Sequence, residues 1–95
     1  MKNEYVIYKY PLGIEVNVFT TITIFIPRDA RIRSVGEQEG KLFVWAEVDS
    51  RPIIKEKRVF MTVATGQSMD TKLDMKYIGT VHYKPFVSHI YELRY

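Results

Sequence analysis

The sequence predicts an all-β fold, a single small antiparallel β-sandwich or barrel of about seven strands. β-Branched and aromatic residues dominate several short segments and alternate along them. Glycine, proline and polar residues separate these segments at short intervals, which is typical of turns between strands. No stretch of comparable length has the period of a helix, so an all-β chain is the simplest interpretation.

Length and composition favour one folded domain over residues 1–95. A chain of 95 residues is too short for two domains that each bury a core. Its hydrophobic fraction of 46% and aromatic fraction of 14% favour a folded chain over a disordered one. We therefore expect a single β domain, without linkers or internal repeats.

Val16–Ile26, with the sequence VNVFTTITIFI, is the clearest strand, because nearly all of its residues are β-branched or aromatic. Pro27 ends it, since proline lacks the backbone donor of a strand. We expect an earlier strand from Tyr5 to Tyr10, followed by a turn at residues 11–13, Pro-Leu-Gly. A later strand is predicted over Arg58–Gly66.

Residues 30–49 are predicted to form a hairpin around Gln38-Glu39-Gly40, with Gly40 in the left-handed conformation that a three-residue loop requires. Glu37 then lies opposite Lys41. A two-residue loop at Glu39-Gly40 is the alternative, but it would place two arginines among valines, which desolvation of charge disfavours.

The three-residue loop sorts this hairpin into two faces. The expected core face carries Ile32, Ser34, Gly36, Leu42, Val44, Ala46 and Val48. The opposite face carries Arg31, Arg33, Val35, Phe43, Trp45 and Glu47.

The C-terminal segment is predicted to be a hairpin that turns at Lys84-Pro85, so that Tyr83 lies opposite Phe86. A pairing shifted by one residue remains an alternative. One face carries Ile78, Thr80, His82, Val87, His89 and Tyr91, and the other carries Tyr77, Gly79, Val81, Tyr83, Phe86, Ser88, Ile90 and Glu92. The polar stretch 67–74 is expected to be a loop, as is the stretch 49–56.

Several classes of function are disfavoured by what the sequence lacks. It has no cysteine, hence no disulfide or thiolate chemistry, and no GxxxxGK[ST], GxGxxG, GxSxG or HExxH motif. We therefore expect no enzyme, no catalytic residue and no cofactor. The N-terminus lacks the apolar segment of a signal peptide, and no apolar run is long enough to cross a membrane, so a cytoplasmic protein is expected. The net charge of +3 allows nucleic-acid binding without favouring it.

Arg31, Arg33, Phe43 and Trp45 are the candidate ligand-binding residues. In the preferred register Arg33 and Trp45 are cross-strand neighbours, so the guanidinium can lie over the indole. Such a face could stack a nucleotide base and hold its phosphate. The alternative is that Trp45 belongs to the core and that Arg31 pairs with Glu47.

His82 and His89 are expected to lie diagonally on adjacent strands, about 7–8 Å apart. Because no third ligand accompanies them, ordinary hydrogen bonds are expected and no metal site is predicted.

The chain has seven tyrosines, more than a small core can hold. If the first and last strands pair, then Tyr5, Tyr8, Tyr91 and Tyr95 would form one interface surface. The alternative is that the rings cover strand edges.

Six segments, in this order along the chain, resemble an uncharacterised family of small β-rich proteins encoded by bacteriophages and prophages. They are YKYPL (8–12), IPRDARIRSV (26–35), GKLFVWAEVD (40–49), RVFMTVATG (58–66), YIGT (77–80) and HIYEL (89–93). The resemblance implies a phage accessory protein and assigns no site residue.

The protein is therefore expected to be a phage accessory protein, a non-enzymatic binding module that acts on a host factor in the host cytoplasm. A component of antiviral defence is one such host factor. The alternatives are sequestration of a small signalling nucleotide by a homo-oligomer, a minor nucleic-acid-binding protein, and a virion protein.

Overall fold

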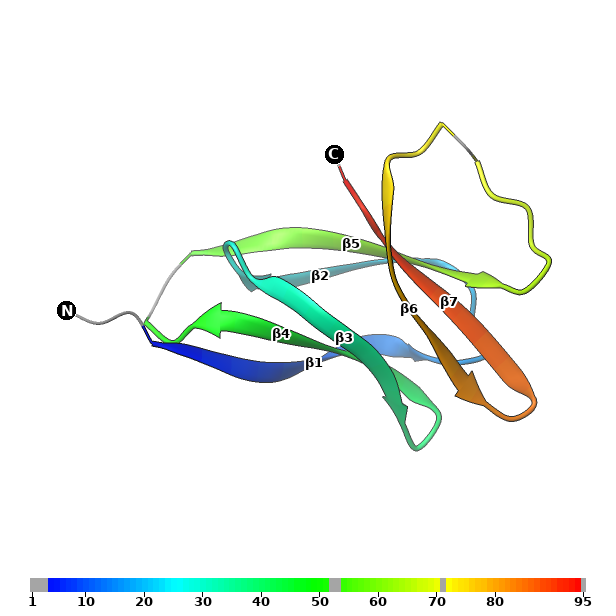
Figure 1. The fold of residues 1–95 in the computed structure, drawn as a ribbon, viewed down its shortest axis with the longest axis horizontal. Helices are drawn as coiled ribbons and strands as arrows, with labels where there is room; N and C mark the ends of the chain where they lie inside the picture. Colours follow the sequence, from blue (N-terminus) through cyan, green and yellow to red (C-terminus); the bar gives the residue numbers. More distant parts are fainter. Residues whose placement is uncertain (1–3, 52–53, 71, 95) are drawn as a thin grey trace.

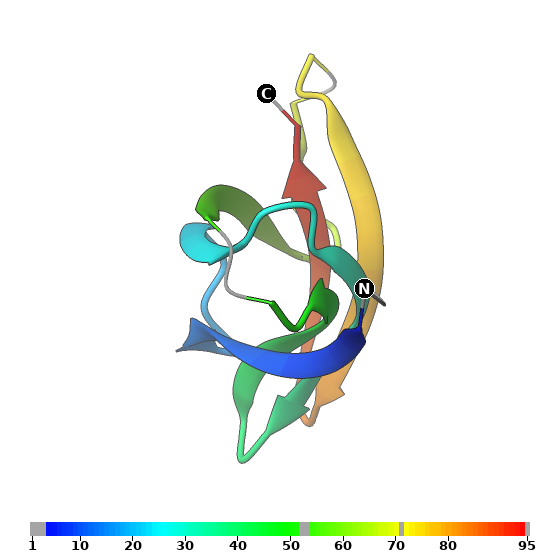
Figure 2. The ribbon, with the colours of Figure 1, turned by 90° about the vertical axis from the view of Figure 1, so that its left-hand side faces the viewer.

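The computed structural model describes residues 4–51, 54–70 and 72–94, and within them it contains seven strands and no helix. One sheet has three strands, in the order β1 (Tyr5–Glu15), β4 (Lys41–Asp49) and β3 (Arg31–Gln38). The other sheet has four strands, in the order β2 (Thr21–Pro27), β5 (Lys55–Ala64), β7 (Phe86–Leu93) and β6 (Met75–Tyr83). All pairings are antiparallel, and Figures 1 and 2 show the two layers. The all-β prediction is confirmed, and the fold is a sandwich, not a closed barrel.

The core lies between the two sheets. Along β4, Leu42, Val44, Ala46 and Val48 are buried and alternate with half-buried residues, so the predicted core face of this strand is confirmed. The main core cluster consists of Leu12, Val16, Leu42, Val44, Phe60, Val81 and Ile90. A smaller cluster toward one end of the sandwich consists of Ile26, Ala30, Ala46 and Val48.

The β3–β4 hairpin differs from the prediction in its loop. Gln38 pairs with Lys41, so the loop has two residues, Glu39 and Gly40, with φ values of 54° and 79°. These left-handed values are those of the type I′ turn that two-residue hairpins favour. The three-residue loop was wrong, and with it the placing of Ser34 and Gly36 on the core face.

A β-bulge resolves the conflict that had disfavoured the two-residue loop. The register shifts between Ile32 and Ser34, so Arg33 is an extra residue without a partner on β4. The shift returns Ile32 to the core face, opposite Ala46, and places Arg31 opposite Glu47. Val35 points inward, not outward as predicted, and packs against the main core cluster.

The N-terminal third was predicted with the wrong boundaries. The expected turn at Pro11-Leu12-Gly13 is an irregular part of β1, which continues to Glu15 with a register shift after Pro11. The expected strand Val16–Ile26 starts only at Thr21. Residues 16–20 form the loop that crosses from one sheet to the other. Only the second part of this β-branched run is therefore a strand.

The C-terminal hairpin follows the predicted register at its turn. Tyr83 lies opposite Phe86, with a cis peptide bond before Pro85, and the buried face carries Val81, Ser88 and Ile90. A shift between Tyr77 and Gly79 makes Ile78 a bulge residue. Tyr77, and not Ile78, therefore shares the outer face with Thr80 and His82. The predicted loop 67–74 is confirmed for its described residues.

Candidate binding surfaces

A pocket opens at one end of the sandwich, where β1, β3 and β5 start and β2 and β4 end. This end is on the left in Figure 1 and faces the viewer in Figure 2. The pocket has a volume of about 690 Å³ and is lined by Tyr5, Arg28, Asp29, Arg31, Asp49, Arg51 and Ile54. We call it the arginine pocket. It combines one predicted ligand-binding residue, Arg31, with one predicted interface residue, Tyr5.

The charged groups of the arginine pocket are unevenly paired. Arg51 donates from its Nε to both carboxylate oxygens of Asp49, at 2.9 and 3.0 Å, and this contact lowers the pKa of Asp49 to about 2. Arg31 has a long contact of 3.9 Å to Glu47. The Arg28 guanidinium has no hydrogen-bond or ion-pair partner among the described residues. Two of the three arginines are thus available to an anion.

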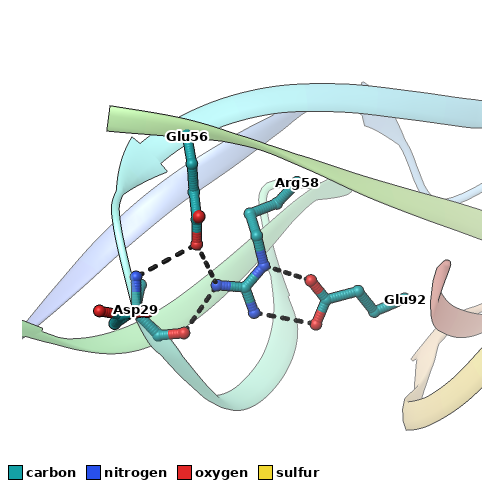
Figure 3. A network of polar contacts seen from close by, with 5 residues as sticks. Asp29, Glu56, Arg58 and Glu92 are labelled. Atoms are coloured by element: carbon teal, nitrogen blue, oxygen red, sulfur yellow. Dashed lines mark hydrogen bonds and ion pairs between the residues drawn. The ribbon is translucent and has the colours of Figure 1, made fainter. Parts of the chain in front are cut away.

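A partly buried polar network supports the wall of this pocket that lies between β2 and β3 (Figure 3). Arg58 donates to Glu92 through Nε and Nη2, the latter at 3.0 Å, and from Nη1 to the Ala30 carbonyl at 2.7 Å. The Asp29 backbone N–H donates to Glu56 at 3.1 Å. The hydrogen bonds to Glu92 raise the pKa of Arg58. The turn that carries Arg28 and Asp29 is therefore fixed from both sides.

The outer face of the three-stranded sheet has an aromatic centre. Phe43 and Trp45 lie on β4 with their ring centroids 6.3 Å apart. The Trp45 indole covers Gly36, where an added Cβ would lie 3.2 Å from Cζ3. The ammonium group of Lys9 lies 4.7 Å from the Phe43 centroid and donates to Gln38 at 2.6 Å, so its side chain spans the sheet.

Arg33 does not contact Trp45 as predicted. The bulge places Ser34 opposite Trp45, whereas Arg33 donates from Nη2 to both carboxylate oxygens of Glu47, at 2.8 and 3.2 Å. Arg31 is opposite Glu47, as the alternative interpretation expected, and lines the arginine pocket. The four predicted ligand-binding residues are therefore divided between an aromatic face and a pocket.

The outer face of the four-stranded sheet carries a hydrogen-bonded histidine. The two ring nitrogens of His89 lie 3.0 Å from the Thr80 hydroxyl and 2.8 Å from the Thr65 hydroxyl. The Tyr77 hydroxyl lies 2.5 Å from that of Thr80. His82 is opposite Val87 and diagonal to His89, as predicted. The described residues include no group of three His, Cys, Asp or Glu side chains that could hold a metal ion.

The predicted tyrosine surface rested on pairing of the first and last strands, and this pairing was wrong. β1 belongs to one sheet, and β7 lies between β5 and β6 in the other. Tyr5 and Tyr8 are both about half exposed, on opposite sides of β1. Tyr91 faces outward from the other sheet against Tyr77, with ring centroids 5.5 Å apart. Tyr95 lies outside the described residues. Tyr5, Tyr8 and Tyr91 therefore do not form one surface, and a role for each in an interface stays a prediction.

The comparisons with known proteins identify a family. The model of a family described as Domain of unknown function (DUF7352) matches residues 3–95. The chain belongs to this family. No curated protein and no solved structure matches it. In the part of the chain that the structure describes, there is no helix long and apolar enough to cross a membrane.

Sequence reasoning missed five of the pocket residues, Arg28, Asp29, Asp49, Arg51 and Ile54. A signal for them exists. In a chain of consecutive antiparallel strands, the end of one strand lies near the start of the next. Arg28-Asp29 follows β2 and Asp49-Ser50-Arg51 closes β4, so two Arg/Asp pairs meet at the same end of the sandwich. Reading strand ends, and not only strand faces, would have found this cluster.

Proposed function

We propose that the protein is a non-enzymatic binding module that engages a host protein through the outer face of its three-stranded sheet. The observation that carries this proposal is the aromatic centre of that face, Phe43 and Trp45, which remains partly exposed. Protein interfaces are enriched in aromatic residues at their centre, and tryptophan is prominent among the residues that dominate binding energy.

The surroundings of this aromatic centre also support a protein partner. Arg33 and Glu47 form a charged rim beside the rings and neutralise each other at 2.8 Å, and the ammonium group of Lys9 lies over the Phe43 ring. On β1, Ile7 continues the apolar surface and is 53% exposed. An apolar centre with a polar rim is the usual arrangement of a protein–protein interface. A nucleotide cradle on this face would need Arg33 to leave Glu47.

The wider biological role follows from the sequence. The order of the six segments that resemble phage-encoded proteins supports an accessory protein that acts in the cytoplasm of an infected host, on a factor such as one of antiviral defence. The lack of motifs for nucleophilic catalysis or nucleotide hydrolysis supports a role in binding.

The test is affinity capture of host proteins from phage-infected cells with tagged wild-type protein and two matched pairs of variants. Ile7→Glu and Trp45→Ala alter the proposed face, whereas Phe25→Glu and Phe25→Ala alter a 65% exposed aromatic residue on the outer face of the other sheet. We expect a specific host protein with the wild type and both Phe25 variants, and its loss with Ile7→Glu and Trp45→Ala. Capture of the same protein by all five chains would contradict the proposed surface, and no specific capture by the wild type would contradict the function.

A further inference from the structure

We infer that the arginine pocket binds a small phosphorylated molecule that carries a planar ring, of the nucleotide class. The pocket lies at the end of the sandwich and borders the proposed host-protein face at Tyr5 and Arg31, but the inference does not rest on the host-protein contact. Its basis is the pocket's size, its two available guanidinium groups, its fixed backbone and its two apolar walls.

The dimensions of the pocket suit a small molecule. Sites for small ligands have volumes of roughly 300–1,000 Å³ and combine apolar walls with a few placed polar groups. The arginine pocket, at about 690 Å³, falls within this range. Its lining contains three arginines, two aspartates, a tyrosine and an isoleucine. This composition provides charge and apolar contact in one cavity.

The charge pattern selects an anion. Arg51 is committed to Asp49, so this pair contributes no net charge. The Arg28 guanidinium has no partner among the described residues. Arg31 lies 3.9 Å from Glu47, whereas Arg33 donates to the same carboxylate at 2.8 and 3.2 Å, so Glu47 is paired mainly with Arg33. Arg28 and Arg31 flank the turn between β2 and β3. Guanidinium groups bind phosphate through paired N–H donors, which a lone ammonium cannot match.

The backbone that carries these arginines is fixed before any ligand arrives. The Arg28 N–H donates to the Ile54 carbonyl at 2.8 Å and the Ala30 N–H donates to the Pro27 carbonyl at 3.2 Å. Arg58 holds the Ala30 carbonyl from the core side. Because these three hydrogen bonds already hold the turn, ligand binding loses little conformational entropy in ordering it.

The apolar residues of the pocket suit a planar ring. Tyr5 is 55% exposed and Ile54 is 71% exposed, and both line the cavity. A nucleobase gains binding energy by stacking on an aromatic side chain, and this contact is open to every base because each has a planar ring. The Asp29 carboxylate can accept a hydrogen bond from a sugar hydroxyl or a ring amino group. These groups would distinguish a nucleotide from free phosphate.

The test is titration calorimetry of the full chain with AMP, adenosine and inorganic phosphate. We expect AMP to bind more tightly than either adenosine or phosphate. Arg28→Ala and Arg31→Ala should each weaken AMP binding by about tenfold or more, the usual loss for a charge-assisted hydrogen bond. Tyr5→Ala should weaken AMP binding and leave phosphate binding unchanged. Asp49→Asn should strengthen AMP binding, because it frees Arg51.

Arg94→Ala is the matched control, since Arg94 is exposed and does not line the pocket. An unchanged affinity in this variant, together with the losses above, would support the inference. Absence of AMP binding, equal affinity for AMP and phosphate, or an equal loss in Arg94→Ala would overturn it. All variants except Asp49→Asn alter exposed side chains, and a thermal melt of each verifies that the fold is intact.

Discussion

Arg58 of β5 and Glu92 of β7 form a two-point ion pair on the inner side of the four-stranded sheet, where their side chains are 19% and 13% exposed. Replacing Arg58 by Met would leave a carboxylate largely removed from water and the Ala30 carbonyl without its donor. We expect Arg58→Met to lower the free energy of unfolding by about 2–4 kcal/mol. Urea denaturation of the variant and the wild type measures this.

A double variant separates the pair from its surroundings. Replacing both partners by methionine removes the unpaired carboxylate, so the double variant should be more stable than Arg58→Met alone. Arg94→Met provides the control for loss of an exposed arginine and should change stability by less than about 0.5 kcal/mol. Equal destabilisation of the single and double variants would argue against a cost from unpaired Glu92.

Thr62 connects the loop of residues 16–20 to β5. Its side chain is buried, and its hydroxyl donates to the Val18 carbonyl at 2.9 Å and accepts from the Thr20 N–H at 2.9 Å. Thr62→Val keeps the shape and removes both bonds, so we expect a loss of about 1–3 kcal/mol in the free energy of unfolding. Thr23→Val, on the exposed outer face of β2, should be nearly neutral. A neutral Thr62→Val in thermal unfolding would refute the role of the hydroxyl.

The β3–β4 hairpin shows what strand periodicity can predict. Alternation along β4 identified the buried face correctly, because a sheet with one face in the core needs every second residue to be apolar. The loop length was wrong because the prediction assumed an unbroken period of two. The bulge at Arg33 adds one residue to β3 and so changes which side chains share a face. The amino-acid composition of the strand gives no sign of such a bulge. Ile78 has the same effect in β6.

The candidate sites were predictable to a lesser degree. Phe43 and Trp45 were singled out correctly as neighbours on one face, since a β-strand fixes that relationship locally. The arginine pocket depends on which strand ends meet, and this is set by the packing of two sheets. The tyrosine surface failed for a related reason. Whether two strands pair is a long-range property that a tyrosine count does not determine.

Gly79 allows β6 to approach β3 at the edge where the two sheets meet. A Cβ added at Gly79 would lie 2.8 Å from Cγ1 of Val35, a β-branched side chain that packs against the core. Because valine has little freedom at χ1, Gly79→Ala should cost about 1–3 kcal/mol in the free energy of unfolding. Val35→Ala in the same chain removes the clash, so the double variant should be more stable than the sum of the two single losses predicts. Simple additivity in urea denaturation would contradict the contact.

The ion pair between Asp49 and Arg51 in the arginine pocket is lost at low pH, when Asp49 becomes protonated. Hydrogen bonds from Arg51 lower the pKa of Asp49 from its ordinary value of 3.8 to about 2. Since the folded-state pKa lies below the unfolded one, the pair stabilises the folded protein fully above pH of about 4, and this contribution is lost as the pH falls through about 2. The Asp49 carboxyl ¹³C resonance should therefore titrate near pH 2 in the wild type and at a higher pH in Arg51→Ala, though still below 3.8, because the variant keeps the hydrogen bond from the backbone N–H of residue 51. Arg28→Ala, in the same pocket, should leave the midpoint near 2, because Arg28 does not contact Asp49. A wild-type midpoint near 3.8 would mean that Arg51 is not held by Asp49 in solution, and three arginines would then face the ligand.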